Sequence, residues 1–115
     1  MPNFDPIIEK ITDYVQSFEA KENSLLEAKT CFFDSLACSF LALEYDQVKK
    51  FCSIEYINNS TGSSRVVGTD IKSNPVEAAF LNGALIRWLD FNDTWLAAEW
   101  GHPSDNLGGI LAAAD

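Results

Sequence analysis

The segment from Asp90 to Asp105 gathers the residue types that move protons in enzymes. It holds the carboxylates of Asp90 and Asp93, the hydroxyl of Thr94 and the only histidine of the chain, His102. A histidine titrates near neutral pH, and a nearby carboxylate supplies the second group that a proton transfer requires. Asp90 and Thr94 share one face if the preceding helix continues through them, with Asp93 on nearly the same side. The segment therefore predicts an acid–base site.

Ordinary structural roles account for the same side chains. Asp90 fits a helix end that faces water, and Asp93 with Thr94 fits a turn closed by their own side chains. His102 fits a loop position, and Ser104 fits the cap of a following helix. The chemistry of the residues leaves both interpretations open. A metal site is not expected, because one histidine with nearby carboxylates offers too few ligands at the spacing that zinc requires.

Two helices are predicted upstream of this segment. The first begins at Asp5-Pro6, because aspartate caps a helix and proline suits its first turn, and a stripe of apolar residues follows. The second begins at Ser24, where Ser24 and Glu27 form a capping box, and it ends near residues 44–45. Apolar side chains cover most of its circumference, which predicts that it is buried among other helices.

The clearest helix start is Asn74, which caps a helix whose first residue is Pro75 and whose Glu77 can reach back to the cap. This helix is predicted to run through Leu89, which places Asp90 on its last turn. Small residues along it would let a neighbouring helix approach closely.

The rest of the chain predicts one more helix and no strand of any length. The last helix is expected over residues 106–115. A short helical turn fits residues 47–51, a loop fits 53–68, and a short extended segment fits 65–69. The fold class is therefore all-α, and the chain is expected to form a segment of a helical bundle.

Composition excludes several classes of partner. The 115 residues are 47% apolar and 22% charged, and their net charge is −9. So acidic a chain is not expected to bind nucleic acid or an anionic membrane surface, and no apolar run is long enough to span a bilayer. Cys31, Cys38 and Cys52 lack metal-binding spacing and are expected to be reduced core thiols. A reducing compartment and the lack of a basic leader predict a cytoplasmic protein.

Two stretches of the sequence resemble a known family. They are residues 87–95, which read RWLDFNDTW, and residues 101–109, which read GHPSDNLGG. Together with NPVEAAF at residues 74–80, they are similar to the 2-methylcitrate dehydratase (MmgE/PrpD) superfamily. The DFNDTW motif and the loop over residues 96–101 resemble the 2-methylcitrate dehydratase branch more than the cis-aconitate decarboxylase branch, whose loop is shorter.

The resemblance implies both a fold and an activity. It implies that residues 1–115 are the N-terminal portion of a larger helical domain, without its remaining helices and its α+β lid domain. The implied lyase removes water from 2-methylcitrate to give 2-methyl-cis-aconitate, in propionate catabolism by the methylcitrate cycle, and needs no cofactor. The active-site aspartate, threonine and histidine of the family fall on Asp90, Thr94 and His102.

A small polycarboxylate is then the expected ligand, and Arg87, Asp93 and Ser104 are expected to contact it. We expect Asp90 or His102 to accept the carbon-bound proton, with Thr94 holding a hydroxyl or carboxylate of the substrate. A tricarboxylate needs several cations in one pocket, whereas this chain has eight basic residues and a charge of −9. The chain alone is therefore predicted to be inactive.

Two alternatives stay open beside this lyase. One is an acidic helical module for interaction or dimerisation without activity of its own, and the other is a related polycarboxylate lyase such as cis-aconitate decarboxylase. The last helix ends without a glycine cap or a basic turn, as a piece of a longer protein would. Helices without their neighbours would leave apolar side chains partly uncovered and favour self-association. The residues expected to be partly exposed are Phe32, Phe33, Phe40, Trp88 and Leu89.

Overall fold

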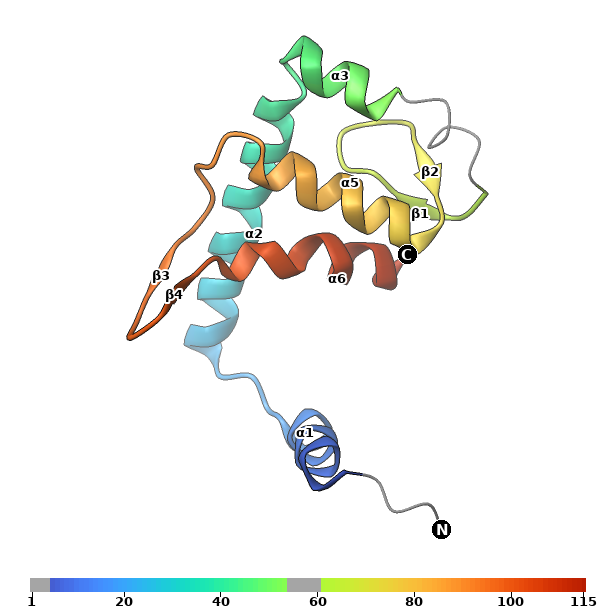
Figure 1. Cartoon of the computed structure of the whole chain (residues 1–115). Coiled ribbons are helices and arrows are strands. Elements are labelled where there is room, and N and C mark those ends of the chain that lie inside the picture. The colour runs from blue at the N-terminus through green and yellow to red at the C-terminus, as the bar shows by residue number, and fades with distance from the viewer. Residues whose placement is uncertain (1–4, 54–60) are drawn as a thin grey trace.

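The computed structural model describes residues 5–53 and 61–115, and in this part of the chain it is predominantly helical (Figure 1). This confirms the all-α prediction. The helices are α1 (Pro6–Ser17), α2 (Glu22–Ala42), α3 (Asp46–Cys52), α5 (Pro75–Arg87) and α6 (Leu107–Ala114), with a 3₁₀ turn η1 (Pro103–Asn106) before α6. Two antiparallel two-residue ladders join them, β1 (Ser64–Arg65) with β2 (Lys72–Ser73) and β3 (Trp95–Leu96) with β4 (Trp100–Gly101).

Helix α1 begins as predicted but makes no extensive contact with another element of the described residues. The Asp5 carboxylate accepts a hydrogen bond from the backbone N–H of Ile7 at 2.8 Å, and Pro6 occupies the first turn. No residue of α1 is buried, and Figure 1 shows the helix standing apart from the others. Its apolar stripe of Ile7, Ile8, Ile11, Val15 and Phe18 is therefore exposed to solvent.

Helix α2 differs from the prediction at both ends and in its burial. It begins at Glu22 after Lys21, without a side-chain cap, so the predicted capping box at Ser24 is wrong. It also ends at Ala42, short of residues 44–45, where the chain turns into α3. Other helices cover only one face of α2, through its small residues Ser35, Cys38, Ser39 and Ala42. The predicted burial around most of the helix is therefore wrong for this chain.

The aromatic side chains expected to be uncovered are so in the structure. Phe33 and Phe40 on α2 are 67% and 54% exposed, and Trp88 after α5 is also exposed. Phe32 and Leu89 are partly buried. This prediction is confirmed, because the small residues of α2 face its neighbours while its rings face outward.

Helix α5 starts where the sequence predicts, but it ends earlier. The Asn74 side chain accepts from the backbone N–H groups of Val76 and Glu77 at 3.0 and 3.1 Å. The helix stops at Arg87 and does not continue through Leu89.

The small residues of α5 allow α6 to lie directly against it, with both helices crossing α2 (Figure 1). A Cβ atom at Gly108 of α6 would come within 2.6 Å of the Ala79 carbonyl oxygen and 2.8 Å of the Gly83 nitrogen. The predicted close approach of a neighbouring helix is thereby confirmed, because only a glycine fits at this crossing.

The segment over residues 61–74 closes the core on the other side of α5. Val66 packs with Leu81, Leu85 and Ala112 in a buried apolar cluster. The buried amide of Asn82 accepts from the Val67 N–H at 2.9 Å and donates to the Arg65 carbonyl at 3.0 Å. Through these two hydrogen bonds, the Asn82 side chain connects the backbone of the β1–β2 region to α5. The predicted extended segment is thus limited to its first residues, and a turn at Gly68 follows (φ +72°).

The remaining expectations about the connectors are met only in part. Helix α3 confirms a helical turn at residues 47–51, and η1 followed by α6 confirms the last helix. Residues 54–60 of the predicted loop lie outside the described residues. Within residues 5–53 and 61–115, no helix is both long and apolar enough to cross a membrane.

Candidate functional site

The chain turns sharply between the end of α5 and the candidate site. The Asp90 N–H donates to the Arg87 carbonyl at 3.0 Å, and Asp90 itself has a φ of +56°, in the left-handed region. Aspartate is among the few non-glycine residues that enter this region without a large penalty. The backbone can no longer continue as a right-handed helix, so the prediction that Asp90 and Thr94 share a helical face is wrong. Asp90 lies in the turn that follows α5, and its side chain is 77% exposed.

The β3–β4 hairpin brings His102 back to the residues that precede it. Trp95 pairs with Gly101, so Thr94 and His102 flank the ladder on the same side. The His102 Nδ1 atom lies 2.6 Å from the Asp93 carbonyl oxygen and 3.4 Å from the Thr94 Oγ1. A carbonyl oxygen only accepts hydrogen bonds, so Nδ1 carries the proton and Nε2 is the free basic atom of the neutral ring.

Asp93 also fixes the start of η1. Its Oδ1 accepts the Ser104 N–H at 3.2 Å, and the Ser104 hydroxyl accepts from the Asn92 amide at 2.7 Å. Ser104 is fully buried, so its side chain holds the two segments together within the fold. The backbone after His102 is therefore anchored to residues 92–93, and the backbone before it pairs with Trp95.

Arg87 holds the other end of the same segment. Its guanidinium lies 3.2 Å from an Asp90 carboxylate oxygen and 3.5 Å from an Asp105 carboxylate oxygen, and it donates to the Asn92 amide oxygen at 3.2 Å. One side chain thus connects the end of α5, the loop after it and η1. A substrate carboxylate would have to compete with these partners for Arg87.

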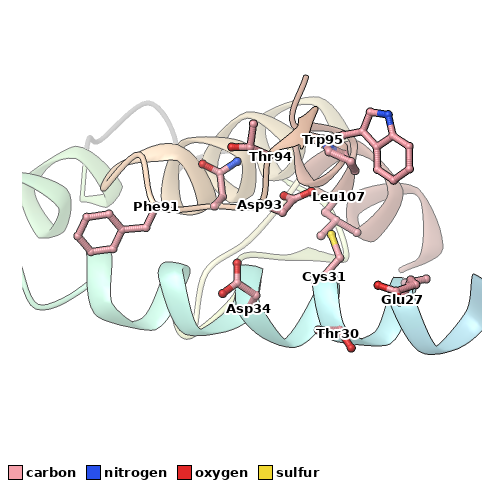
Figure 2. A pocket seen from close by; sticks show the side chains of 12 residues that line it. Glu27, Thr30, Cys31, Asp34, Phe91, Asp93, Thr94, Trp95 and Leu107 are labelled. Carbon is pink, nitrogen blue, oxygen red and sulfur yellow. The ribbon is translucent and has the colours of Figure 1, made fainter. Parts of the chain in front are cut away.

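A pocket of about 1080 Å³ lies between α2 and this loop (Figure 2). Asp93 and Thr94 line it from above, and α2 contributes Cys31 and Asp34 from below. The other lining residues are Glu27, Ala28, Thr30, Phe91, Asn92, Trp95, Pro103 and Leu107. Among the described residues, Arg87, Asp90, His102 and Ser104 are not part of this lining. The structure therefore places Asp93 and Thr94 in the pocket wall, with His102 in contact with both of them, whereas Asp90 pairs with Arg87 outside the lining.

The pocket is electronegative, since Glu27, Asp34 and Asp93 are its only charged lining residues in the described part of the chain. Burial, followed by the charge of Asp93 and a hydrogen bond with it, raises the pKa of the Cys31 thiol. The indoles of Trp95 and Trp100 are exposed, although Trp100 stacks edge-on against His102 with ring centroids 5.5 Å apart.

Sequence reasoning missed the contribution of α2 to this site. Cys31 was interpreted as a small core residue, yet it lines the pocket. The available signal was Asp34, a charged residue within a largely apolar helix, which indicates a polar surface facing that position. No group of three or more metal-ligating side chains is clustered within residues 5–53 and 61–115.

Comparison with protein families gives a match over nearly the whole chain. Residues 9–115 match the MmgE/PrpD N-terminal domain. This match covers every residue of the site described above.

Curated relatives agree with the family match. The chain is 53% identical to "2-methylcitrate dehydratase" of Salmonella typhimurium and 52% identical to "2-methylcitrate dehydratase" of Escherichia coli, in each case over 99% of this chain and 24% of the relative. It is 46% identical to "2-methylcitrate dehydratase, mitochondrial" of Yarrowia lipolytica, over 99% of this chain and 22% of that protein. The chain thus spans about a quarter of the length of these relatives.

Proposed function

Because the chain belongs to the MmgE/PrpD N-terminal domain family, we propose that it supplies part of the active site of a lyase that dehydrates 2-methylcitrate to 2-methyl-cis-aconitate in the methylcitrate cycle. The single observation that carries this proposal is the geometry of His102. With Nδ1 hydrogen-bonded to the Asp93 carbonyl at 2.6 Å, the neutral ring presents Nε2 as a base of fixed orientation.

Dehydration requires two proton transfers. A base removes the carbon-bound proton, the carbon–carbon double bond forms, and the hydroxyl leaves as water after an acid donates a proton to it. We assign the first transfer to His102, since its ring contacts Asp93 and Thr94 of the pocket wall through Nδ1 and leaves Nε2 as the basic atom. Thr94, which lies 3.4 Å from His102 Nδ1, would hold a hydroxyl or carboxylate of the substrate. Asp90 is the alternative proton acceptor, because its carboxylate is exposed.

The substrate carboxylates need cations that the pocket lining lacks. Glu27, Asp34 and Asp93 would repel a tricarboxylate. Arg87 is the cation nearest the motif, and we propose that it exchanges one of its carboxylate partners for a carboxylate of the substrate. Asp93 would contact the substrate from the pocket wall, whereas contact with the fully buried Ser104 would require the loop to open. The 115-residue chain alone is expected to show no dehydration, and further cations are expected from regions that the longer relatives have.

The test of this function is an assay of the full-length gene product with 2-methylcitrate, citrate and cis-aconitate in parallel. Dehydration of 2-methylcitrate in preference to the other acids supports the proposal. Release of carbon dioxide from cis-aconitate supports instead a related lyase, a cis-aconitate decarboxylase. Turnover of none of these acids contradicts both lyase proposals.

A second function is favoured by the exposed apolar stripe of α1. An acidic helical module that binds another protein or a second copy would use such a surface, and it would need no catalysis of its own. Absence of turnover together with stable self-association would support this alternative. For either function we propose the cytoplasm, because the three cysteines are free thiols and Cys38 and Cys52 are buried.

A further inference from the structure

Asn92 is a buried amide between the end of α5 and the turn η1. The residue is only 4% exposed, and both ends of its side chain are hydrogen-bonded. Its Oδ1 accepts from Arg87 Nη1 at 3.2 Å, and its Nδ2 donates to Ser104 Oγ at 2.7 Å. An arginine only donates hydrogen bonds, so this contact fixes which end of the amide faces Arg87. Asn92 therefore connects a cation of the site to the turn that follows His102.

The Arg87 guanidinium meets its three partners through three different nitrogen atoms. Nη2 lies 3.2 Å from an Asp90 carboxylate oxygen and Nε lies 3.5 Å from an Asp105 carboxylate oxygen, whereas Nη1 donates to Asn92. Nε and Nη2 form an edge of the guanidinium that binds a carboxylate through two parallel hydrogen bonds. Both aspartates at this edge are exposed, and Asn92 is buried. An anion that arrives from solvent therefore meets the Nε–Nη2 edge, while the contact through Nη1 stays in place.

The other end of the amide links the two segments that the His102 ring also bridges. The ring joins them through the 2.6 Å contact between His102 Nδ1 and the Asp93 carbonyl. Ser104 belongs to the 3₁₀ turn that begins directly after His102, whose carbonyl accepts the Asp105 N–H at 3.0 Å. The Asn92–Ser104 hydrogen bond thus runs parallel to the contact of the ring. It limits how far the two segments can separate, and with it the length of the ring contact.

We propose that Asn92 is a positioning residue, whose buried amide fixes Arg87 on one side and the turn of His102 on the other. It thereby keeps the cation that receives a substrate carboxylate and the base that accepts the proton at a constant separation. The relevance of this link to catalysis rests on the proposed function. The link itself concerns only this chain and is measurable without turnover.

The first test reads the tautomer of His102 in the 115-residue chain, where it is the only histidine. At a pH at which the ring is neutral, the ¹⁵N resonances of Nδ1 and Nε2 report which nitrogen carries the proton. The wild type is expected to carry it on Nδ1, the atom that faces the Asp93 carbonyl. Asn92→Ala removes the parallel link, so the ring contact is expected to loosen and the proton to be shared between both nitrogens.

Two further variants separate positioning from a general loss of stability. Asn92→Asp still accepts from Arg87 and also accepts from the Ser104 hydroxyl, so it is expected to keep the wild-type tautomer. Asn82→Ala is the matched control, because Asn82 is likewise a buried amide with two hydrogen bonds, at 2.9 and 3.0 Å, and these join α5 to the β1–β2 region. It is expected to leave the tautomer unchanged. Circular dichroism verifies that each variant keeps its helices.

Steady-state kinetics of the full-length gene product on 2-methylcitrate is the second test. Asn92→Asp places another carboxylate on Arg87, so KM is expected to rise about tenfold with little change in kcat. Asn92→Ala releases the turn of the base, and it is expected to lower kcat about tenfold. Asn82→Ala is expected to leave both constants near their wild-type values.

An unchanged tautomer in a folded Asn92→Ala variant, or an equal change in Asn82→Ala, would overturn the proposal. So would an unchanged KM in Asn92→Asp. If Asn92→Ala does not fold, Ser104→Ala takes its place in the tautomer test, because it removes the same hydrogen bond from the other end. A wild-type protein without turnover would contradict the proposed function alone, and the tautomer would in that case still decide the role of Asn92.

Discussion

The imidazole of His102 is anchored to a backbone carbonyl and not to a carboxylate, because its Nδ1 lies 2.6 Å from the carbonyl oxygen of Asp93. A carbonyl does not titrate, so it holds the ring in one tautomer at every pH at which the ring is neutral. It also leaves Nε2 free to accept a proton, with the side chain of Thr94 close to the same ring. The segment between Arg87 and α6 thus holds the His102 ring in one orientation.

Removal of the imidazole should abolish most of the catalysis. In the full-length gene product, His102→Ala is expected to lower kcat on 2-methylcitrate by about 10²- to 10⁴-fold, because a general base contributes on this scale. Steady-state kinetics measures the effect. Ser53→Ala, a change at an exposed residue at the end of α3, serves as the control and should leave kcat unaltered. A His102→Ala enzyme with near-normal kcat would exclude the histidine as the base.

Asp90 is a separate candidate for the base, and its backbone conformation allows a substitution that removes the carboxylate charge without disturbing the turn. Asn adopts the left-handed conformation as readily as Asp, so Asp90→Asn should keep the turn at φ +56° while removing the charge. If Asp90 accepts the proton, kcat is expected to fall about 10²-fold or more. Near-normal turnover in this variant would remove Asp90 from the base role and leave it as a residue of the turn after α5. Urea unfolding of the same variant verifies that the turn has kept its stability.

The crossing of α5 and α6 requires a glycine at one of two adjacent positions. Gly108→Ala would place a Cβ atom 2.6 Å from the Ala79 carbonyl oxygen, so it is expected to reduce the free energy of unfolding by about 1–3 kcal/mol. Gly109→Ala meets no atom within 4 Å and is expected to raise the free energy of unfolding by up to about 1 kcal/mol, because alanine favours helix. Urea titration of both variants measures the difference. Equal effects would contradict the packing described for this crossing.

The exposed stripe of α1 should cause self-association of the isolated chain. We expect sedimentation velocity to show concentration-dependent association that Ile11→Glu weakens, since Ile11 is 58% exposed within this stripe. Gln16→Glu introduces the same charge on the polar side of the helix and should change little. A wild-type chain that stays a compact monomer at millimolar concentration would contradict this prediction.

Sequence patterns predicted those features that depend on a few neighbouring residues. Asp5-Pro6 and Asn74-Pro75 start helices because each cap uses its own side chain and the next two or three N–H groups. The resemblance over residues 87–109 indicated the candidate site, and the structure places Asp93, Thr94 and His102 together there. Periodicity did not predict the end of α5, since the left-handed turn at Asp90 competes with an apolar pattern that continues through Leu89.

Features that depend on contacts between distant segments could not be predicted from sequence patterns. The β3–β4 ladder has two residues in each strand, which is too short for an alternating pattern, yet it is what returns His102 to Thr94. Cys31 and Asp34 reach the pocket only because α2 crosses the loop after α5. The capping box at Ser24 failed since the chain is already helical from Glu22.

Arg87 holds the loop through three partners, and a ligand carboxylate can replace the two carboxylates among them. The guanidinium is held by Asp90 and Asp105 through carboxylates of the same chemical type as those on the proposed ligand. An incoming anion that engages Arg87 therefore releases one of these aspartates, and the link between α5 and η1 loosens as it binds. Arrival of the anion and a change in the mobility of residues 90–105 are thus expected to occur as one event.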